Sequence, residues 1–393
     1  MITPIPLLTA LIPTLGMLSG LTASFTVTLL LIALLLKSRG TLSFSIKDYK
    51  LETLFLIWCF ICCFVTPNPM KSLTSFLEVF FFIVLGLVLK NKIAINNDSQ
   101  IKIEKAVFYG IAAAVILFFI EYFSQGMVFR NFRNIFQSDS PSFYQLNSLD
   151  RGCALLSISS WIVIANLLNS RKYVQVLCFY GLVFLVLYLS DSLASLIGFI
   201  LAGLLLIFGR FISTKFFKVA TILTLIGSIL FPITVHKIDP YKTSEEYSEV
   251  LPDSAKHRLF IWHFVSERLE HNSFTGAGFA ASRQFVASDK EMIEYRNYHW
   301  SPLPLHPHSN VLQILFETGI IGFVLFMSIV LKNLRKVEDL VKSNINFGSA
   351  SYACFVNYYV IGMISFSIWQ AWWVATAVWA VVMLNIVSKK LES

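Results

Sequence analysis

Charged side chains are scarce in this sequence. The chain of 393 residues has 31 Lys and Arg and 23 Asp and Glu, so only 14% of its residues are charged, whereas 56% are hydrophobic and the mean hydropathy is +0.69. A soluble protein of this length cannot hide that much apolar surface in one or two cores. The composition therefore excludes a soluble globular enzyme and predicts an all-α polytopic membrane protein.

Motifs of several familiar sites are also missing. The sequence has no Asp-x-Asp pair, which many transferases use to hold a divalent metal. A single Gly-x-Gly, at Gly276 and Gly278, lacks the strand-loop-helix context of a nucleotide site. Five of the six cysteines lie in apolar runs, where a free thiol behaves as a small hydrophobe, and Cys153 follows shortly after Arg151. We therefore expect no metal and no cofactor.

Long apolar runs are what the chain has in abundance. A helix of roughly 20 apolar residues crosses the hydrocarbon core of a bilayer. The stretch "LGMLSGLTAS" between the first two runs could be a bend within one hairpin or a loop, and Pro4 and Pro6 take the place of a signal peptide's charged n-region. About twelve runs have the required length: 4–18, 20–36, 51–66, 72–89, 105–124, 152–168, 173–189, 191–209, 216–234, 310–331, 348–368 and 370–388.

The distribution of basic residues predicts the orientation. Most Lys and Arg residues lie in alternate short loops such as "KSRGTLSFSIKDYK" and "KNLRKVEDLVKSN", and basic loops resist translocation. Both termini should therefore be cytoplasmic, and the net charge of +8 reflects topology, not a nucleic-acid partner. The predicted organisation is a bundle of about nine spans (1–234), a large outer loop with an amphipathic helix (235–309), and three spans with a cytoplasmic tail (310–393).

The large outer loop contains an expected amphipathic helix, "PDSAKHRLFIWHFVSERLEH". Asp253 or Ser254 could cap its first turn, and the helix should lie on the membrane surface. Arg258 and Trp262 are four residues apart, so they share a face and could place a guanidinium beside an indole. The alternative for Arg258 is a surface residue that reaches lipid phosphate.

A second arginine stands in the other long outer loop, 125–151. Arg151 begins the sixth span, where its charge needs a wet cavity or a partner, and the neighbouring Asp150 could be that partner. A guanidinium binds phosphate oxygens bidentately and keeps its charge. Arg151 and Arg258 are therefore candidate anion-binding residues on the outer side.

The large loop ends in the most polar stretch of the chain, "LHPHSNVLQILFETGIIG" (305–322). The loop holds all seven histidines, and two of them, His306 and His308, directly precede an apolar run that carries a lone glutamate, Glu317. A histidine in this place could act as a base or could cap the helix. Glu317 could be a buried structural partner or a supporting group, and we favour the structural role.

The block "HSNVLQILFETG", with Arg151 and the Arg-x-x-x-Trp pair 258–262, resembles the O-antigen ligase/polymerase superfamily. That superfamily comprises lipopolysaccharide O-antigen ligases, O-antigen polymerases and protein O-oligosaccharyltransferases. The motifs cover roughly residues 140–330. Family members usually have His-Asn before the Leu-Gln pair, whereas Ser309 follows His308 here and Asn310 stands one place later.

The resemblance implies a GT-C-like, metal-independent glycosyltransferase of the Gram-negative inner membrane with its active site facing the periplasm. Its donor would be a glycan on undecaprenyl pyrophosphate, its acceptor a sugar hydroxyl of lipid A-core, and its surroundings membrane lipids. The resemblance implies catalytic roles for His308, Arg258 and Arg151. It implies substrate-binding roles for Trp262, His306, Asn310 and Glu317.

Three functions remain open at this point. An O-antigen ligase fits best, and a polymerase or a protein O-oligosaccharyltransferase of the same superfamily is the main alternative. A membrane transporter is the third, but transporters place charged or broken segments at the bilayer midplane. Here the ionisable residues gather at the outer surface, which favours chemistry over transport.

Overall fold

The chain folds into helices and one small hairpin. The computed structural model describes residues 4–38, 46–90, 96–136, 144–269 and 274–388. The strands β1 (Ile293–Tyr295) and β2 (Tyr298–Trp300) pair antiparallel. The helices are α1 (Pro4–Gly16), α2 (Gly20–Lys37), α3 (Lys50–Cys62), α4 (Pro69–Lys90), α5 (Asn97–Ser124), α6 (Met127–Phe136), α7 (Asp150–Asn169), α8 (Tyr173–Leu189), α9 (Leu193–Phe211), α10 (Lys215–Lys237), α11 (Pro240–Glu246), α12 (Asp253–Arg268), α13 (Asn310–Ser343), α14 (Ile345–Ile364) and α15 (Ala371–Ser388).

The prediction of an all-α polytopic membrane protein is confirmed. A helix occupies each of the twelve apolar runs, because such runs satisfy their backbone hydrogen bonds internally. Eight described helices are long and apolar enough to cross a membrane: α2, α4, α5, α7, α9, α10, α13 and α15. The helices α1 and α8 are apolar but shorter. The stretch between the first two runs is a short turn at 17–19, so α1 and α2 form a helical hairpin.

Several helix ends differ from the predicted spans: α5 begins earlier, at Asn97, α13 continues to Ser343, and two other helices end early. The span expected at 348–368 ends at Ile364, and residues 365–370 form a turn before α15. The run expected at 51–66 ends its helix at Cys62. The turn after Cys62 buries Cys63 and Thr66, and the turn 365–370 buries Ser367 and Trp369, so apolar character continues past both helix ends. Both turns contact the candidate site described below.

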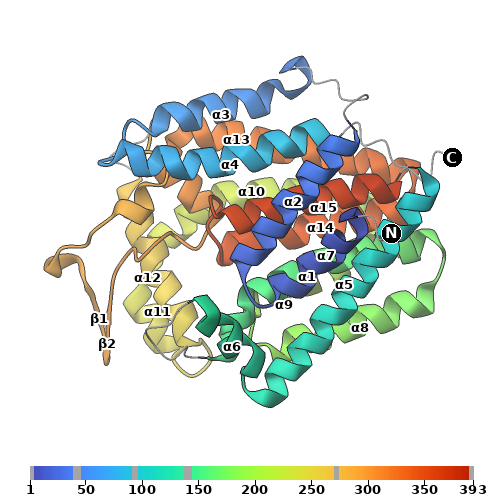
Figure 1. Cartoon of the computed structure of the whole chain (residues 1–393). Coiled ribbons are helices and arrows are strands. Elements are labelled where there is room, and N and C mark those ends of the chain that lie inside the picture. Colours follow the sequence, from blue (N-terminus) through green and yellow to red (C-terminus); the bar gives the residue numbers. More distant parts are fainter. Residues whose placement is uncertain (1–3, 39–45, 91–95, 137–143, 270–273, 389–393) are drawn as a thin grey trace.

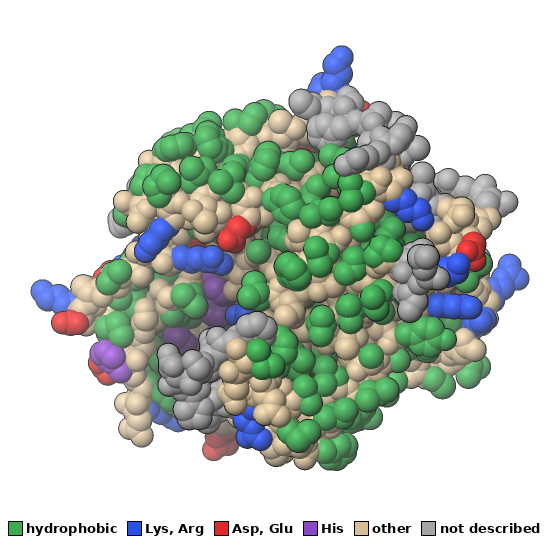
Figure 2. All heavy atoms as spheres, in the orientation of Figure 1, with side chains coloured by type: hydrophobic (Ala, Val, Ile, Leu, Met, Phe, Trp, Pro, Cys, Tyr) green, Lys and Arg blue, Asp and Glu red, His purple; other side chains and the backbone are tan. Residues whose placement is uncertain are grey.

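The central helix of the bundle is α7. Almost every side chain from Gly152 to Ala165 is buried, and Trp161 is among the largest buried side chains. Figure 1 shows α11, α12 and the hairpin at one end of the bundle, and the two chain ends at the other. In Figure 2, hydrophobic side chains cover the middle of the visible face, and Lys and Arg side chains lie mostly towards its two ends.

The outer elements are fixed to one another by polar contacts. Arg296 at the hairpin turn donates two hydrogen bonds, of 3.0 and 2.8 Å, to the carboxylate of Glu245 on α11. The Tyr298 hydroxyl donates to Asp253 at the start of α12 (2.6 Å). These contacts tie the hairpin, α11 and α12 together as one cap over the end of the bundle.

The topology is testable by reporter fusion. The distribution of basic loops predicts that residue 244, in the cap, lies in the periplasm and that residue 393 lies in the cytoplasm. We expect an alkaline phosphatase fusion to be active after Ser244 and inactive after Ser393, with a fluorescent reporter giving the reverse pattern. Reporters that locate both positions on the same side would show this topology to be wrong.

Candidate active site

A break in α13 shapes the floor of the candidate site. Gly319 has φ +64° and ψ −168°, which interrupts the helix nine residues after it begins. A Cβ at Gly319 would lie 2.1 Å from the Phe274 carbonyl oxygen, so both the backbone angle and the close approach require glycine. The carbonyl groups of Phe316 and Thr318 beside the break accept hydrogen bonds from the Ala277 amide (2.7 Å) and the Trp58 indole (2.8 Å). The glycine-rich loop from the outer cap is thereby docked onto α13 and α3.

Glu317 organises the same docking and does not face a substrate space. Its carboxylate is fully buried and accepts hydrogen bonds from the backbone amides of Ala280 (2.9 Å) and Ser282 (3.2 Å). It also accepts from the side chains of Gln313 (3.2 Å) and Trp369. Four donors on three separate segments therefore converge on one carboxylate. The structural role that the sequence favoured fits this geometry, whereas direct substrate contact does not.

We expect Glu317→Ala to destabilise the protein. The substitution leaves two buried backbone amides and two side-chain donors without their acceptor, and each such loss costs about 1–3 kcal/mol. The thermal unfolding midpoint of the detergent-purified variant should fall clearly below that of wild type. Glu317→Gln, which keeps one acceptor oxygen, should fall less. An unchanged midpoint for Glu317→Ala would contradict the assigned role.

His308 lies just outside α13, and one of its ring nitrogens is held in place. The residue has φ +52°, and the N-cap of α13 is Ser309. His308 therefore does not cap the helix, which was the alternative role considered for it. Its Nδ1 is 2.7 Å from the carbonyl oxygen of Ser365, in the turn after α14. A carbonyl can only accept, so Nδ1 carries the proton and the lone pair of the neutral ring is on Nε2. Nε2 has no hydrogen-bond partner among the described residues.

His306 contacts both the backbone and the ring of His308. Its side chain is buried, with 5% of its surface exposed, and its Nδ1 accepts a hydrogen bond from the backbone amide of His308 (3.1 Å). The two ring centroids are 4.1 Å apart. The expected substrate contact by His306 therefore does not fit its burial, and it is a positioning residue for His308.

Trp262 and Asn310 also hold this segment in place. The Trp262 indole donates to the Pro307 carbonyl (2.9 Å), and its ring packs edge-on against Phe231 of α10. Asn310 is buried, and its amide nitrogen donates to the carbonyl groups of Gly362 and Phe366 (3.1 and 3.3 Å). Both were expected to bind substrate, but their polar atoms engage the protein itself. They join the His-Pro-His segment to α12 and α14.

Burial keeps both histidines neutral. Desolvation lowers the pKa of His308 from 6.5 to about 4, with a further contribution from the positive charge of Arg258, while the hydrogen bond to Ser365 opposes the shift. Desolvation, the neighbouring His308, and the charges of Arg283, Arg258 and Arg151 lower the pKa of His306 to about 2. Loss of hydration is thus the main reason why both imidazoles stay neutral.

The two arginines lie close enough to the histidines to lower their pKa values, and they form no ion pair among the described residues. Neither guanidinium of Arg151 or Arg258 forms an ion pair or a hydrogen bond with a residue that the structure describes. The alternative pairing of Arg151 with Asp150 is thus not found. The expected stacking of Arg258 on Trp262 is also not found within the described ranges. Burial lowers the pKa of Arg258, and the nearby Asp150 opposes that change. Figure 2 shows histidine side chains in a hollow of the visible face beside a Lys or Arg side chain.

The helix α12 forms as expected, but its expected cap and its expected place on the membrane surface do not fit the structure. The helix forms at Asp253–Arg268, but no side chain caps its first turn, because the Asp253 carboxylate accepts from Lys256 (3.2 Å) and Tyr298 instead. Its buried face carries Phe260, Ile261 and Val265. That face packs on α10, α13 and the hairpin, and a surface helix on the membrane would need it exposed.

A cavity of about 890 Å³ adjoins the site on the Arg151 side. Its walls are the turn 16–22, the α6 side chains Phe129, Phe132 and Arg133, and Arg151 and Phe366. Phe366 follows Ser365, the residue that holds His308, so the cavity and the histidine share one turn. Leu21 and Phe25 at the cavity are exposed, at 77% and 63%. The cavity thus combines a cationic end, where Arg133 and Arg151 outnumber Asp150, with apolar walls that reach the surface.

Neither the helix α6 nor the role of the Ser365 carbonyl was predicted from the sequence. The loop 125–151 contains α6, whose first amides, of Val128 and Phe129, donate to the buried carboxylate of Glu121 (2.9 and 3.1 Å). The repeat "FRNFRN" has the spacing of an amphipathic helix and could have revealed it. Ser365 acts through its backbone carbonyl, so no side-chain pattern could have identified it.

Comparisons with known proteins identify the family of the chain. Residues 176–327 match the protein family described as O-antigen ligase. The chain is similar to a protein of Rickettsia felis named "Putative polysaccharide ligase", with 42% identity over 96% of each chain. It is also similar to proteins with that designation from Rickettsia conorii, at 41% identity, and Rickettsia typhi, at 42%, again over 96% of each chain.

Proposed function

The chain belongs to the O-antigen ligase superfamily, and on that premise we propose that it transfers a glycan from undecaprenyl pyrophosphate to a sugar hydroxyl of lipid A-core. The observation that carries the proposal is the hydrogen bond from His308 Nδ1 to the Ser365 carbonyl. It fixes the tautomer that leaves Nε2 free to accept a proton, next to two guanidinium groups that form no ion pair with a described residue. This combination suits an attack by a hydroxyl on a phosphate ester of a sugar.

The reaction would proceed by direct displacement at the anomeric carbon. The acceptor hydroxyl oxygen forms a bond to that carbon while the bond from the carbon to the pyrophosphate oxygen breaks. Nε2 of His308 takes the hydroxyl proton, and the pyrophosphate leaves with the bonding electron pair. Arg151 and Arg258 stabilise the negative charge that builds up on the leaving group, which is a role that a metal has in other transferases.

The cavity beside Arg151 has the form that the donor requires. The lipid pyrophosphate would bind at its cationic end, and the polyprenyl chain would lie along Phe129 and Phe132 and leave past Leu21 and Phe25. A lipid donor in the outer leaflet could then enter sideways without crossing water. The glycan would lie beneath the outer cap formed by α11, α12 and the hairpin.

Deletion of the gene in its host tests the assignment as a ligase. A ligase deletion should abolish polymer on lipid A-core while full-length glycan accumulates on the lipid carrier. A deletion strain that still attaches a single repeat unit to the core would instead indicate a polymerase. Normal surface polysaccharide in the deletion strain would contradict both functions.

We expect the acid limb of the pH profile of kcat/KM to lie well below pH 6.5. The proposed base must be neutral, and the pKa of His308 is about 4 in the free protein, so protonation blocks Nε2 only as the pH falls towards that value. Transfer by purified protein, measured between about pH 4 and 8, gives the limb. Arg258→Lys, which keeps the charge, should leave the limb near its wild-type position. A wild-type limb near pH 6.5 would contradict the arrangement described for His308.

A further inference from the structure

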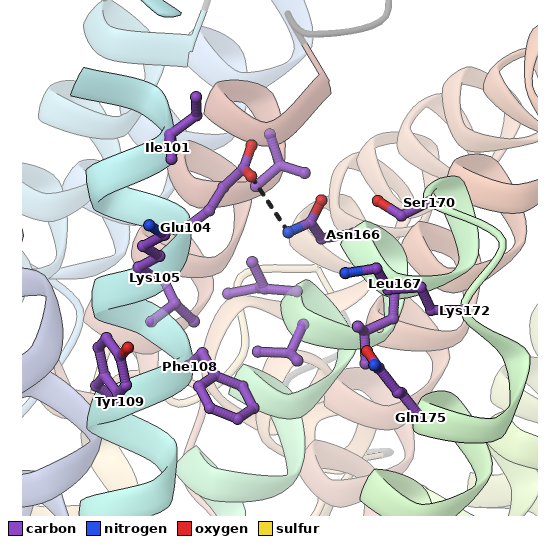
Figure 3. A pocket seen from close by; sticks show the side chains of 14 residues that line it. Ile101, Glu104, Lys105, Phe108, Tyr109, Asn166, Leu167, Ser170, Lys172 and Gln175 are labelled. Carbon is purple, nitrogen blue, oxygen red and sulfur yellow. Dashed lines mark hydrogen bonds between the residues drawn. The ribbon is translucent and has the colours of Figure 1, made fainter. Parts of the chain in front are cut away.

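A second cleft lies at the opposite end of α7 from the candidate active site. It is formed by α5, the last turn of α7, the first turns of α8 and Val387 of α15, and has a volume of about 410 Å³ (Figure 3). Asn166 in the cleft is fifteen residues from Arg151 on the same helix, or about 22 Å along its axis. This separation approaches the thickness of a bilayer core, so the cleft faces the other leaflet.

Two lysines, against one carboxylate, give the cleft a net positive charge. Lys105 of α5 and Lys172 at the start of α8 line the cleft, and both are exposed. Neither side chain forms an ion pair or a hydrogen bond with any residue in the described ranges. Lys102, one turn earlier on α5, is different because it pairs with Asp98 at 2.6 Å and does not line the cleft.

The one carboxylate of the cleft is already engaged. Glu104 accepts hydrogen bonds from Asn166 on α7 (3.2 Å, drawn in Figure 3) and from Gln100 on its own helix (3.2 Å). Gln100 in turn donates to the Val387 carbonyl of α15 (3.2 Å). The carboxylate therefore joins three helices behind the cleft, and its single negative charge offsets only one of the two lysines.

The remaining lining is mostly apolar, with a few polar side chains. Ser170, Gln175 and Tyr109 offer hydroxyl and amide groups beside the lysines, as Figure 3 shows. Phe108 and Ile101 line the same cleft from α5 and are each 44% exposed. Phe108 also meets Phe179 of α8, with ring centroids 6.3 Å apart, and so connects the two helices. Charge and hydrogen-bonding groups thus border an apolar wall that continues onto the membrane-facing surface.

We propose that this cleft binds the head group of an anionic glycerophospholipid in the leaflet opposite the active site. The phosphate ester would lie between Lys105 and Lys172, and the glycerol hydroxyls of the head group would meet Ser170 and Gln175. The acyl chains would follow Ile101 and Phe108. Basic clefts between membrane helices suit such head groups, because each lysine near the surface adds attraction to anionic lipid. The bound lipid would bridge α5 to α7 and α8.

Lipid-induced thermal stabilisation of the purified full-length protein tests the proposal. The probes are phosphatidylglycerol, phosphatidylcholine with the same acyl chains, and water-soluble glycerol phosphate. We expect phosphatidylglycerol to raise the unfolding midpoint of wild type and the other two probes to have little effect. Native mass spectrometry on the same samples counts the phosphatidylglycerol bound and gives its apparent Kd.

The variants are chosen to separate the cleft from the general surface. Lys105→Ala combined with Lys172→Ala should weaken the apparent Kd for phosphatidylglycerol by about 30-fold. Lys102→Ala, the matched control on the same helix, should change it less than threefold. Both lysines are exposed, so the variants should match the wild-type midpoint without lipid.

Four results would overturn the proposal. A double variant with the wild-type Kd, or a control variant that loses as much affinity, would mean that the lysines of the cleft do not select the lipid. Equal stabilisation by phosphatidylcholine would mean ordinary lipid packing. Equal stabilisation by glycerol phosphate would mean that the ligand is a free phosphate ester. None of these results depends on the glycan-transfer reaction.

Discussion

Replacement of His308 by alanine is expected to lower the rate of glycan transfer by about 100- to 10,000-fold while the protein remains folded. The reason is that Nε2 of His308, the proposed base, has no hydrogen-bond partner among the described residues, and general bases typically contribute that much. The measurement is transfer from purified lipid-linked donor to lipid A-core. In cells the full-length donor should accumulate.

Two other histidines serve as controls for this variant. His306→Ala should retain a substantial fraction of activity, because it removes a partner of the His308 backbone amide but leaves the hydrogen bond to Ser365. His299→Ala, on the exposed hairpin, should transfer at the wild-type rate. A His308→Ala protein with normal stability and the wild-type rate would rule out the proposed base.

Removal of either arginine should have the next largest effect. Arg151→Ala and Arg258→Ala are each expected to reduce transition-state stabilisation by about 2–4 kcal/mol, as removal of a preorganised charge-stabilising group does. Arg→Lys should restore activity only in part, since an ammonium group cannot hold two phosphate oxygens with the planar fork of a guanidinium. The loss should appear in kcat/KM for the lipid-linked donor.

Arg296→Ala is the matched control for the arginine variants. Arg296 lies in the same outer cap, but its guanidinium is exposed and paired with Glu245, so its loss should cost little transfer activity. If Arg151→Ala and Arg258→Ala transferred as well as this control at equal protein levels, the two residues would be surface groups that contact lipid.

The helices could be predicted because their signal is local. Each of the twelve apolar runs predicts a helix by itself, because a run of that length can form all its backbone hydrogen bonds within one helix. The positions of Arg151, Arg258 and His308 near one another follow from the expected topology, which brings the outer ends of α7, α12 and α13 to one side. The motif residues themselves were visible in the sequence because they are polar in an apolar chain.

The exact roles of the residues around His308 could not be predicted because they depend on contacts between distant segments. Asn310 and Glu317 look like ligands in a linear motif, yet their polar atoms bind the turn 365–370 and the loop 274–285. The Ser365 carbonyl that fixes the tautomer of His308 leaves no trace in residue types. The need for glycine at position 319 is a further case. A Cβ there would clash with the Phe274 carbonyl, which is 45 residues earlier in the chain.

The central claim is that a neutral histidine and two arginines perform the transfer without a metal. The most direct measurement is single-turnover transfer by purified wild-type protein from lipid-linked glycan to lipid A-core, with and without an excess of chelator. The account predicts the same rate in both reactions, with pyrophosphate-linked carrier released in equal amount to the glycan transferred. Loss of transfer in the presence of chelator, restored by adding back a divalent metal, would contradict it.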